Sequence, residues 1–257
     1  MILFTNAVLI NEDLADWLAD SPPLMIEVTL HSLKEDVFER ITRVKGSFKA
    51  CLRGIDLIAS RRLPLTVKTV CMRENKDEIV RIQKFAGKNK AQFKFDSYLI
   101  ASFHLPGVAE KYRLSVDEVA AIEAKDFRIL KQWNECLIDY RCLGLKDDPS
   151  PFCSAGLYNF YINPDLQLGL CHLLNRPRFD LTDKTFKEGF TGFLSAERAK
   201  LCYRPVDCLD CPADVFCGQC PARADVECND PQAKVEYLCD FAKKRYVVFK
   251  PILEPAV

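Results

Sequence analysis

Short apolar runs alternate with helix-like patterns through the first 140 residues of the chain. The apolar runs predict strands over residues 1–5, 24–30, 65–70 and 91–100. Apolar side chains at helical spacing predict helices over residues 11–20, 34–42, 47–60, 75–85 and 115–140. Strands that alternate with helices in this way indicate βαβ units on a parallel sheet. We therefore expect an α/β fold.

The predicted sheet has only four strands, a number that is difficult to reconcile with a complete parallel fold. A parallel sheet needs both of its faces covered, and a closed barrel contains more strands than this. Met1 also opens directly on a strand, with no capping element before it. The pattern is typical of a barrel whose first units are missing. We expect the chain to behave poorly alone, or to pair with a partner chain that supplies the missing strands.

The pattern changes after about residue 141, where Pro, Gly, Asp and Cys become more frequent. Residues 157–162 and 167–171 are strand-like and flank the turn Asn163–Pro164–Asp165, which predicts a hairpin. Irregular structure over 176–189 is followed by a short helix near 195–201, a cysteine-rich loop and a last helix over 235–246. We expect two domains, residues 1–140 and residues 141–257.

Composition narrows the class of protein. Lys+Arg and Asp+Glu both number 36, so the charge predicts no nucleic-acid partner. No apolar run is long enough for a membrane span, and the apolar start lacks the basic lead of a signal peptide. We therefore expect a cytoplasmic protein. In that reducing compartment, the 13 cysteines indicate metal ligands rather than disulfides.

The stretch CLDCPADVFCGQC holds four of these cysteines. Thiolates are soft ligands that suit zinc or iron–sulfur clusters, and one site of either kind takes about four. Seven well-placed cysteines exceed one site and nearly fill two; they are Cys153, Cys171, Cys208, Cys211, Cys217, Cys220 and Cys239. Zinc in the same thiolates is the alternative to iron–sulfur, and disulfides fit less well because the cysteine count is odd.

The order of these cysteines resembles the SPASM domain, the auxiliary-cluster module of many radical S-adenosylmethionine (SAM) enzymes. The stretches FCSAGLYNFYINPDLQLGLC, CGQCPA and YLCDFAKKRY carry the resemblance, although Leu166 stands where the family usually has glycine. The resemblance implies one [4Fe–4S] cluster held by Cys208, Cys211, Cys217 and Cys239. It implies a second cluster held by Cys153, Cys171 and Cys220, with Cys142 as the candidate fourth ligand.

The N-terminal half resembles the partial TIM barrel of radical SAM enzymes from its third strand onward. The stretches are FTNAVLINEDLADWL, IEVTLHSLKEDVFERITRVKGSF, LPLTVKTV and FKFDSYLI. The resemblance implies a truncated barrel of about four βα units, with Asn6, Thr29 and Lys68 at strand ends facing the SAM pocket. Each has an ordinary alternative: a turn residue, a strand residue and a solvated strand end, respectively.

The chain lacks the Cys-x3-Cys-x2-Cys triplet whose cluster binds SAM in that family. SAM is therefore expected as a cofactor only if the missing N-terminal part is supplied. His172 follows Cys171, where some family members place a proton-accepting carboxylate, so it is the candidate catalytic residue. The alternative, which we favour, is that His172 is a surface histidine or one that supports a cluster ligand without binding the cluster itself.

Two functions follow from these residues. The first is the cluster-binding portion of a radical SAM enzyme that modifies a peptide or protein, with auxiliary clusters for substrate binding or electron transfer. The second is a non-catalytic iron–sulfur or zinc module that binds a partner peptide or relays electrons. A plain α/β enzyme with a zinc tail finds little support, because the phosphate-loop, G-x-S-x-G and H-E-x-x-H motifs are absent.

Overall fold

The computed structural model describes residues 1–102, 107–142, 153–174, 176–201, 208 and 211–253. It divides into two compact units. Unit 1 comprises Met1–Leu99 and Glu110–Leu114, and unit 2 comprises Ile100–Ala109 and Ser115–Val257. The helical segment that follows residue 115 therefore groups with the cysteine-rich part, whereas composition placed the domain boundary at residue 140.

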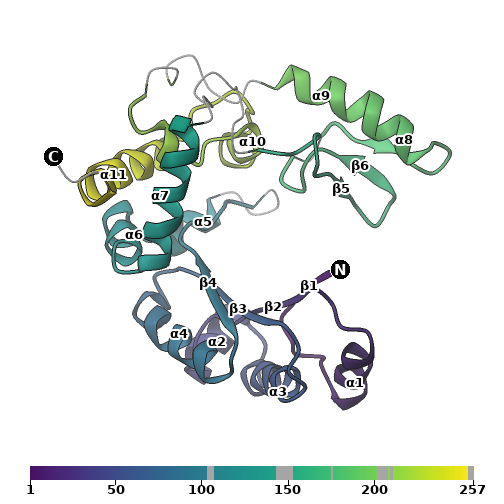
Figure 1. Ribbon diagram of the computed structural model, residues 1–257, viewed down its shortest axis with the longest axis vertical. Helices are drawn as coiled ribbons and strands as arrows, with labels where there is room; N and C mark the ends of the chain where they lie inside the picture. Colours follow the sequence, from purple (N-terminus) through teal and green to yellow (C-terminus); the bar gives the residue numbers. More distant parts are fainter. Residues whose placement is uncertain (103–106, 143–152, 175, 202–207, 209–210, 254–257) are drawn as a thin grey trace. The chain divides into compact units, whose positions relative to one another are not determined.

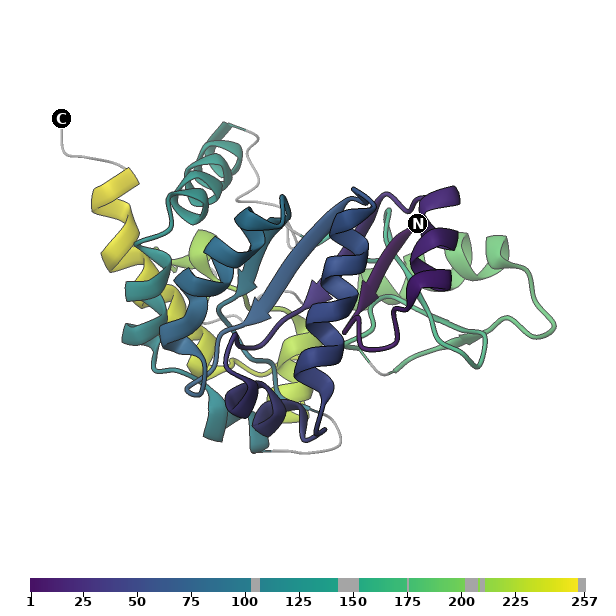
Figure 2. The same ribbon diagram turned by 90° about the horizontal axis from the view of Figure 1, so that it is seen from below.

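Unit 1 is built on a parallel sheet of four strands in the order β1-β2-β3-β4, as the apolar pattern predicted. The strands are β1 Ile2–Thr5, β2 Met25–Thr29, β3 Leu65–Val70 and β4 Gln92–Asp96. The helices between them are α1 Glu12–Asp20, α2 Glu35–Thr42, α3 Ser47–Ser60 and α4 Ile79–Lys88, with a short 3-10 turn, η1 Lys76–Glu78, before α4. Helices α1, α3 and α4 lie below the sheet in Figure 1 and in front of it in Figure 2. Right-handed crossovers between strands in sequential order give this one-sided arrangement.

The two faces of this sheet differ in character. Ile26, Val28 and Val67 are buried on one face, with helix residues such as Ile55 and Ile58 also fully buried. Most alternate residues of the same strands are polar, among them Thr66 and Lys68, and Glu27 is 2% exposed in the middle of β2. Because side chains alternate between the faces of a strand, the apolar residues form the core and the polar ones share the opposite face.

A close backbone approach explains one glycine of unit 1. A Cβ atom on Gly54 of α3 would lie 2.2 Å from the carbonyl oxygen of Ala7, in the loop after β1. No other residue fits this helix against that loop without a shift of the backbone.

Unit 2 contains most of the helices of the second half and a small antiparallel sheet. Helix α5, Val108–Tyr112, crosses the division between the units. The other elements are α6 Val116–Glu123, α7 Phe127–Cys142, β5 Tyr161–Ile162, β6 Gln167–Gly169, β7 Phe179–Asp180, α8 Phe186–Glu188, the π-helix η3 Gly189–Leu194, α9 Ser195–Lys200, the 3-10 turn η5 Asp214–Phe216, α10 Pro221–Cys228 and α11 Glu236–Leu253. Strands β5 and β6 form the predicted hairpin, and β7 adds a third strand that the sequence pattern did not indicate.

The predicted helix over 115–140 is wrong in one respect, because the structure breaks it between α6 and α7. Ser115 and Glu118 do form the capping box at its start. The break follows from Asp126, whose carboxylate accepts a hydrogen bond from the Arg128 backbone N–H at 3.0 Å and so caps a new helix.

The turn of the hairpin keeps a glycine-like conformation without glycine. Leu166 has a φ angle of 57°, in the left-handed region. The side chain of Asn163 accepts hydrogen bonds from the N–H groups of Asp165 at 3.1 Å and Gln167 at 2.8 Å, and these bonds hold the turn. No helix among the described residues is long and apolar enough to cross a membrane.

Candidate cysteine sites and the carboxyl edge of the sheet

The first cysteine group consists of Cys208, Cys211, Cys217 and Cys239, all with reduced thiols. A chain of backbone hydrogen bonds curls the loop that carries three of them: Cys211 N–H to the Cys208 carbonyl at 3.3 Å, and Cys217 N–H to the Asp214 carbonyl at 2.9 Å. Cys239 comes from α11. Sulfur atoms from the loop and from the helix are thereby brought toward one another.

Cys217 lies at the electrostatic centre of this group. The pKa of its thiol is raised to about 11, mainly by burial and in addition by the neighbouring thiols of Cys208, Cys211 and Cys239. The backbone N–H of Gln219 donates to the Cys217 Sγ at 3.4 Å and acts in the opposite direction. As anions these three thiols would repel the Cys217 thiolate, and either protonation or a bound cation removes that repulsion.

Gln219 also fastens this loop to the start of α11. Its side-chain amide donates to the Ala233 carbonyl at 2.7 Å and its oxygen accepts from the Val235 N–H at 3.2 Å. The two bonds fix the loop that carries Cys217 against the helix that carries Cys239.

The second cysteine group consists of Cys153, Cys171 and Cys220. Cys171 and Cys220 pack against one apolar cluster, whose buried members are Leu168, Leu170, Leu174, Leu194 and Ala222. Burial raises the pKa of Cys220, the Arg223 backbone N–H bonded to its sulfur lowers it, and Cys153 raises it. Cys153 and Cys220 are therefore within electrostatic range of each other, and the fourth candidate, Cys142, has a side chain outside the described residues.

Arg198 of α9 secures the backbone at Cys153. Its guanidinium donates to the Cys153 carbonyl at 3.0 Å and to the Ala155 carbonyl at 2.5 Å. A residue that is distant in the sequence thus sets the position of this cysteine.

His172 is exposed at the surface. Its Nδ1 lies 4.0 Å from the Cys171 Sγ, and its ring meets Tyr161 edge-on at a centroid distance of 6.2 Å. This placement suits a histidine that supports a cluster ligand as well as one that accepts a proton from a substrate. The catalytic role of His172 therefore stays a prediction.

The residues predicted at strand ends of unit 1 differ in their surroundings. Asn6 is exposed, and its side chain accepts from the Val8 N–H at 3.1 Å, as a turn residue does. Thr29 ends β2 and is partly buried. Lys68 lies within β3, where its Nζ is 2.8 Å from the Asp96 carboxylate and 3.5 Å from that of Glu27. It is therefore not a solvated strand end, and the cofactor role of all three stays a prediction.

Glu27 is a buried carboxylate that the sequence reading missed. Its second carboxylate oxygen, Oε2, contacts the Nζ of Lys94, although no hydrogen bond to that oxygen has good geometry among the described residues. Burial lowers the pKa of Lys68. The carboxylates of Asp96 and Glu27 raise it, and the net shift of the Lys68 pKa is upward. The only sequence signal is one charged residue inside the apolar run of β2.

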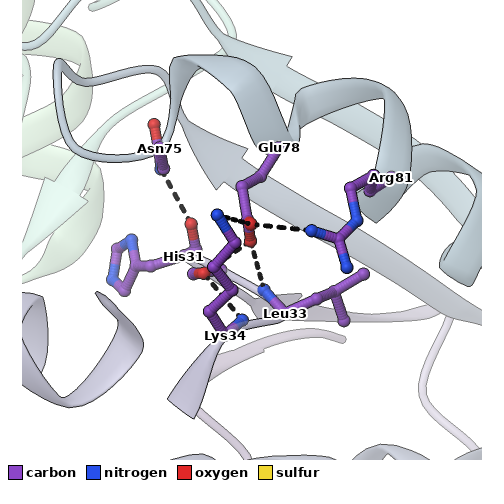
Figure 3. Close-up of polar contacts among 7 residues, drawn as sticks. His31, Leu33, Lys34, Asn75, Glu78 and Arg81 are labelled. Atoms are coloured by element: carbon purple, nitrogen blue, oxygen red, sulfur yellow. Dashed lines mark hydrogen bonds and ion pairs between the residues drawn. The ribbon is translucent and has the colours of Figure 1, made fainter. Parts of the chain in front are cut away.

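A second buried network joins the loops after β2 and β3 at the carboxyl edge of the sheet (Figure 3). Glu78 is 2% exposed, and its Oε2 accepts from the Ser32 hydroxyl at 2.6 Å and the Leu33 N–H at 2.8 Å. Its Oε1 lies 3.3 Å from the Lys34 Nζ and 3.2 Å from Arg81 Nη1. Burial raises the pKa of Glu78, but the hydrogen bonds from Ser32, Leu33 and Lys34 outweigh it and lower the pKa.

Asn75 completes this network from the loop after β3. Its side-chain N–H donates to the His31 carbonyl at 2.8 Å and to the Val70 carbonyl at 2.9 Å, while its oxygen accepts from the Met72 N–H at 2.8 Å. The carboxyl edge of a parallel sheet is where ligands bind in such folds. Asn75 and Glu78 therefore hold the loops of a candidate ligand-binding edge in place.

We expect Glu78→Gln to destabilise unit 1 by about 1.5–3 kcal/mol at neutral pH, since the charged acceptor of buried hydrogen bonds is lost. Because the folded pKa of Glu78 is lowered, the native protein should lose this stabilisation as the pH falls below about 4.5. The Gln variant should lose less stability over that acid range. Urea unfolding at several pH values measures both effects.

Glu35→Gln is the matched control, because Glu35 forms an exposed pair with Lys49, 3.2 Å apart. Such pairs contribute about 0–1 kcal/mol. Equal losses from the two variants would contradict the assigned role of Glu78.

The first third of the chain is similar to radical SAM proteins. Residues 1–86 match the family model described as the Radical SAM superfamily. A curated relative, GTP 3′,8-cyclase of Clostridium perfringens (strain SM101 / Type A), is 30% identical over 94 residues, which are 36% of this chain and 28% of that enzyme. The chain thus aligns with little more than a quarter of the length of this relative.

Solved structures share the fold across nearly the whole chain. Native anSMEcpe with bound AdoMet aligns with a TM-score of 0.72 at 17% identity, and the alignment covers 98% of this chain and 73% of that chain. SuiB of Streptococcus suis bound to S-adenosylmethionine has a TM-score of 0.60 at 15% identity, over 93% of this chain and 59% of its own. At these identities the likeness establishes the fold alone, an α/β arrangement with a parallel sheet of four strands.

Proposed function

We propose that this chain is the iron–sulfur cluster-binding portion of a radical SAM/SPASM enzyme that modifies a peptide or a protein. The observation that carries the proposal is the surroundings of Cys217. The thiols within its electrostatic range, Cys208, Cys211 and Cys239, are the three that the SPASM resemblance assigns to the same cluster. The radical SAM match of residues 1–86 supports the enzyme class.

The residues of the first cysteine group fit a [4Fe–4S] cluster, which takes about four cysteine thiolates. A bound cluster supplies one-electron storage and transfer. The chain contributes the thiolates of Cys217 and its three neighbours, the Gln219 N–H that donates to the Cys217 sulfur, and surroundings that partly bury Cys217. Hydrogen bonds to the sulfurs and exclusion of water are the means by which a protein sets a cluster's potential.

The resemblance to the SPASM cysteine order favours iron–sulfur over zinc, which is the alternative in the same thiolates. Four sulfurs around one zinc ion lie roughly 3.8 Å apart, as a Zn–S bond of about 2.3 Å in a tetrahedron requires. A cubane spreads its ligands more widely, because each sulfur binds a different iron. Iron and zinc analysis of the reconstituted chain distinguishes the two.

The residues present do not fit the cluster that chelates SAM, since the chain has no Cys-x3-Cys-x2-Cys. We therefore derive no SAM-dependent step from this chain. SAM binding at Asn6, Thr29 and Lys68 is proposed only for an assembly in which further residues supply that cluster.

A peptide or protein is the proposed substrate. Two of the solved neighbours are described with peptides, anSMEcpe with the Kp18Cys peptide and SuiB with its precursor peptide SuiA. Their shared fold with this chain makes a peptide the first ligand to test here.

The second candidate function is a non-catalytic iron–sulfur module that binds a partner peptide or relays electrons. The missing cysteine triplet favours it. Incubation of the reconstituted chain with SAM and a reductant separates the two candidates: formation of 5′-deoxyadenosine by this chain alone would exclude the non-catalytic module.

We expect anaerobic reconstitution to load about eight irons per chain, two clusters of about four. Cys217→Ala should remove about half of that iron, because Cys217 belongs to the first cysteine group only. Iron and sulfide analysis measures the loading. Absorbance at about 400 nm, which is typical of thiolate-to-iron charge transfer, measures it independently.

Cys228→Ala is the control, because Cys228 is an exposed cysteine at the end of α10 and belongs to neither group. It should leave the iron content unchanged. A colourless protein that takes up only zinc would overturn the proposal.

We also propose that a second polypeptide adds a parallel strand beside β1. Strand β1 ends the sheet of unit 1, and its Ile2 and Phe4 are 43% and 67% exposed. Further large apolar side chains are exposed in β1, α1 and the segments that flank them: Met1, Leu9, Leu14, Trp17 and Leu24. β1 has no Lys or Pro to block pairing, and such an edge accepts an added strand.

A further inference from the structure

Arg178 lies directly against strand β6 of unit 2. A Cβ atom on Gly169 would lie 1.7 Å from its Nη1, so the guanidinium occupies the space that glycine leaves. Nη1 donates a hydrogen bond to the Cys171 carbonyl at 3.2 Å, and the guanidinium stands 5.2 Å from the ring centroid of Tyr161. The absence of a side chain at Gly169 thus brings a cation to the backbone of a candidate cluster ligand.

This cation lacks a carboxylate partner within the described part of the chain, where no ion pair involves Arg178. The Arg178 side chain is partly buried, and burial lowers its pKa, whereas Tyr161 and the Cys171 thiol raise it. Arginine stays charged even so. The Cys171 sulfur is within electrostatic range of the guanidinium, so a Cys171 thiolate that ligates a metal would face a partly buried positive charge.

We propose that Arg178 is a positioning residue that holds Cys171 and balances the negative charge of a cluster in the second cysteine group. The inference rests on the proposed function. A fixed positive charge beside a cluster stabilises the reduced form, which carries one more electron, so Arg178 raises the reduction potential. Its hydrogen bond to the Cys171 carbonyl fixes the end of β6 from which the sulfur projects.

The test is a potentiometric titration of the full chain with dithionite, followed by electron paramagnetic resonance of the reduced cluster. A Cys217→Ala background removes the first cluster, so the signal reports the second one. We expect Arg178→Gln to lower the reduced-to-oxidised ratio at a fixed potential about tenfold, which corresponds to about 59 mV for one electron. Arg178→Lys keeps the charge and should stay within about threefold of the parent.

Two further variants separate this charge from general effects. Arg176→Gln removes an exposed arginine two positions away and should leave the potential unchanged. Gly169→Ala should act like Arg178→Gln, because the added methyl displaces the guanidinium, the flexible end of a side chain.

The outcomes distinguish the inference from the function on which it rests. A parent protein that binds no iron overturns both. Equal iron loading with an unchanged potential in Arg178→Gln overturns the inference and leaves the proposed function standing. If Arg178→Lys shifts the potential as far as Arg178→Gln, the charge is not the cause and the inference is also wrong.

Discussion

Replacing Arg245 with alanine should lower the free energy of unfolding of unit 2 by about 3–5 kcal/mol, the usual cost of leaving a buried carboxylate unpaired. Arg245 of α11 donates from Nε and Nη2 to Glu123, at 2.8 and 2.5 Å, and Glu123 is 2% exposed. Its guanidinium lies 3.7 Å from the ring centroid of Phe241 and 4.8 Å from that of Trp133. The change removes the ion pair and both ring contacts together.

The same side chain reaches the first cysteine group. Arg245 Nη1 donates to the Phe216 carbonyl at 3.4 Å, and Cys217 follows Phe216 directly. Phe216 and Phe249 are buried in an apolar cluster that also contacts Trp133. Arg245 therefore joins α6, α11 and the cysteine loop, and we expect the alanine variant to expose the loop as well as to weaken the helices.

Lys244→Ala is the matched control on the neighbouring position of α11. Lys244 contacts the Asp117 carboxylate, but Asp117 is largely exposed, so the pair should contribute about 0–1 kcal/mol. Denaturant unfolding followed by the fluorescence of Trp133, in a Trp17→Phe background, reports on unit 2 alone. Losses below about 1 kcal/mol in both variants would show that the Arg245 pair is not a structural anchor.

The apolar pattern predicted unit 1 well because its physical cause is local. Apolar residues recur at alternate positions of the strands, and each helix has one apolar face, so the periods of two and 3.6 residues are visible in the sequence. The four parallel strands were confirmed. The errors lie where a single polar residue changes the local structure, as at Asp126, which ends one helix and caps the next.

Unit 2 was harder to predict, since little of it follows an apolar period. The hairpin was expected from its turn residues, whereas β7, the π-helix η3 and α10 were not. Helix α10 begins at Pro221, directly after Cys220. The apolar pattern predicts no element over 221–228, although a proline in the first turn is a helix-start signal.

The buried polar groups could not be foreseen, because their partners are distant in the sequence. Ser32 and Glu78 are 46 positions apart, and Glu123 and Arg245 are 122 apart. The cysteines were grouped by a different route, the resemblance to the SPASM domain. That resemblance assigns Cys217 to one cluster with the three thiols that lie within its electrostatic range, while their role as cluster ligands stays a prediction.

We expect Phe4→Lys to weaken self-association of the isolated chain about 10- to 100-fold, because burying a Phe side chain contributes about 1.5–3 kcal/mol. Phe4 is 67% exposed on β1, the edge to which we propose that a second polypeptide adds its strand. Without that partner, two copies of the chain can meet through the same edge. Sedimentation velocity over a range of concentrations measures the association.

Val80→Lys is the control, because Val80 is 58% exposed on α4 and belongs to the same unit. It adds the same charge to a surface that we do not assign to a partner, so it should leave self-association nearly unchanged. If the two variants weaken self-association equally, the cause is the added charge and not the loss of the apolar β1 edge. A native chain that is monomeric at all concentrations and highly stable without metal would mean that the β1 edge needs no added strand.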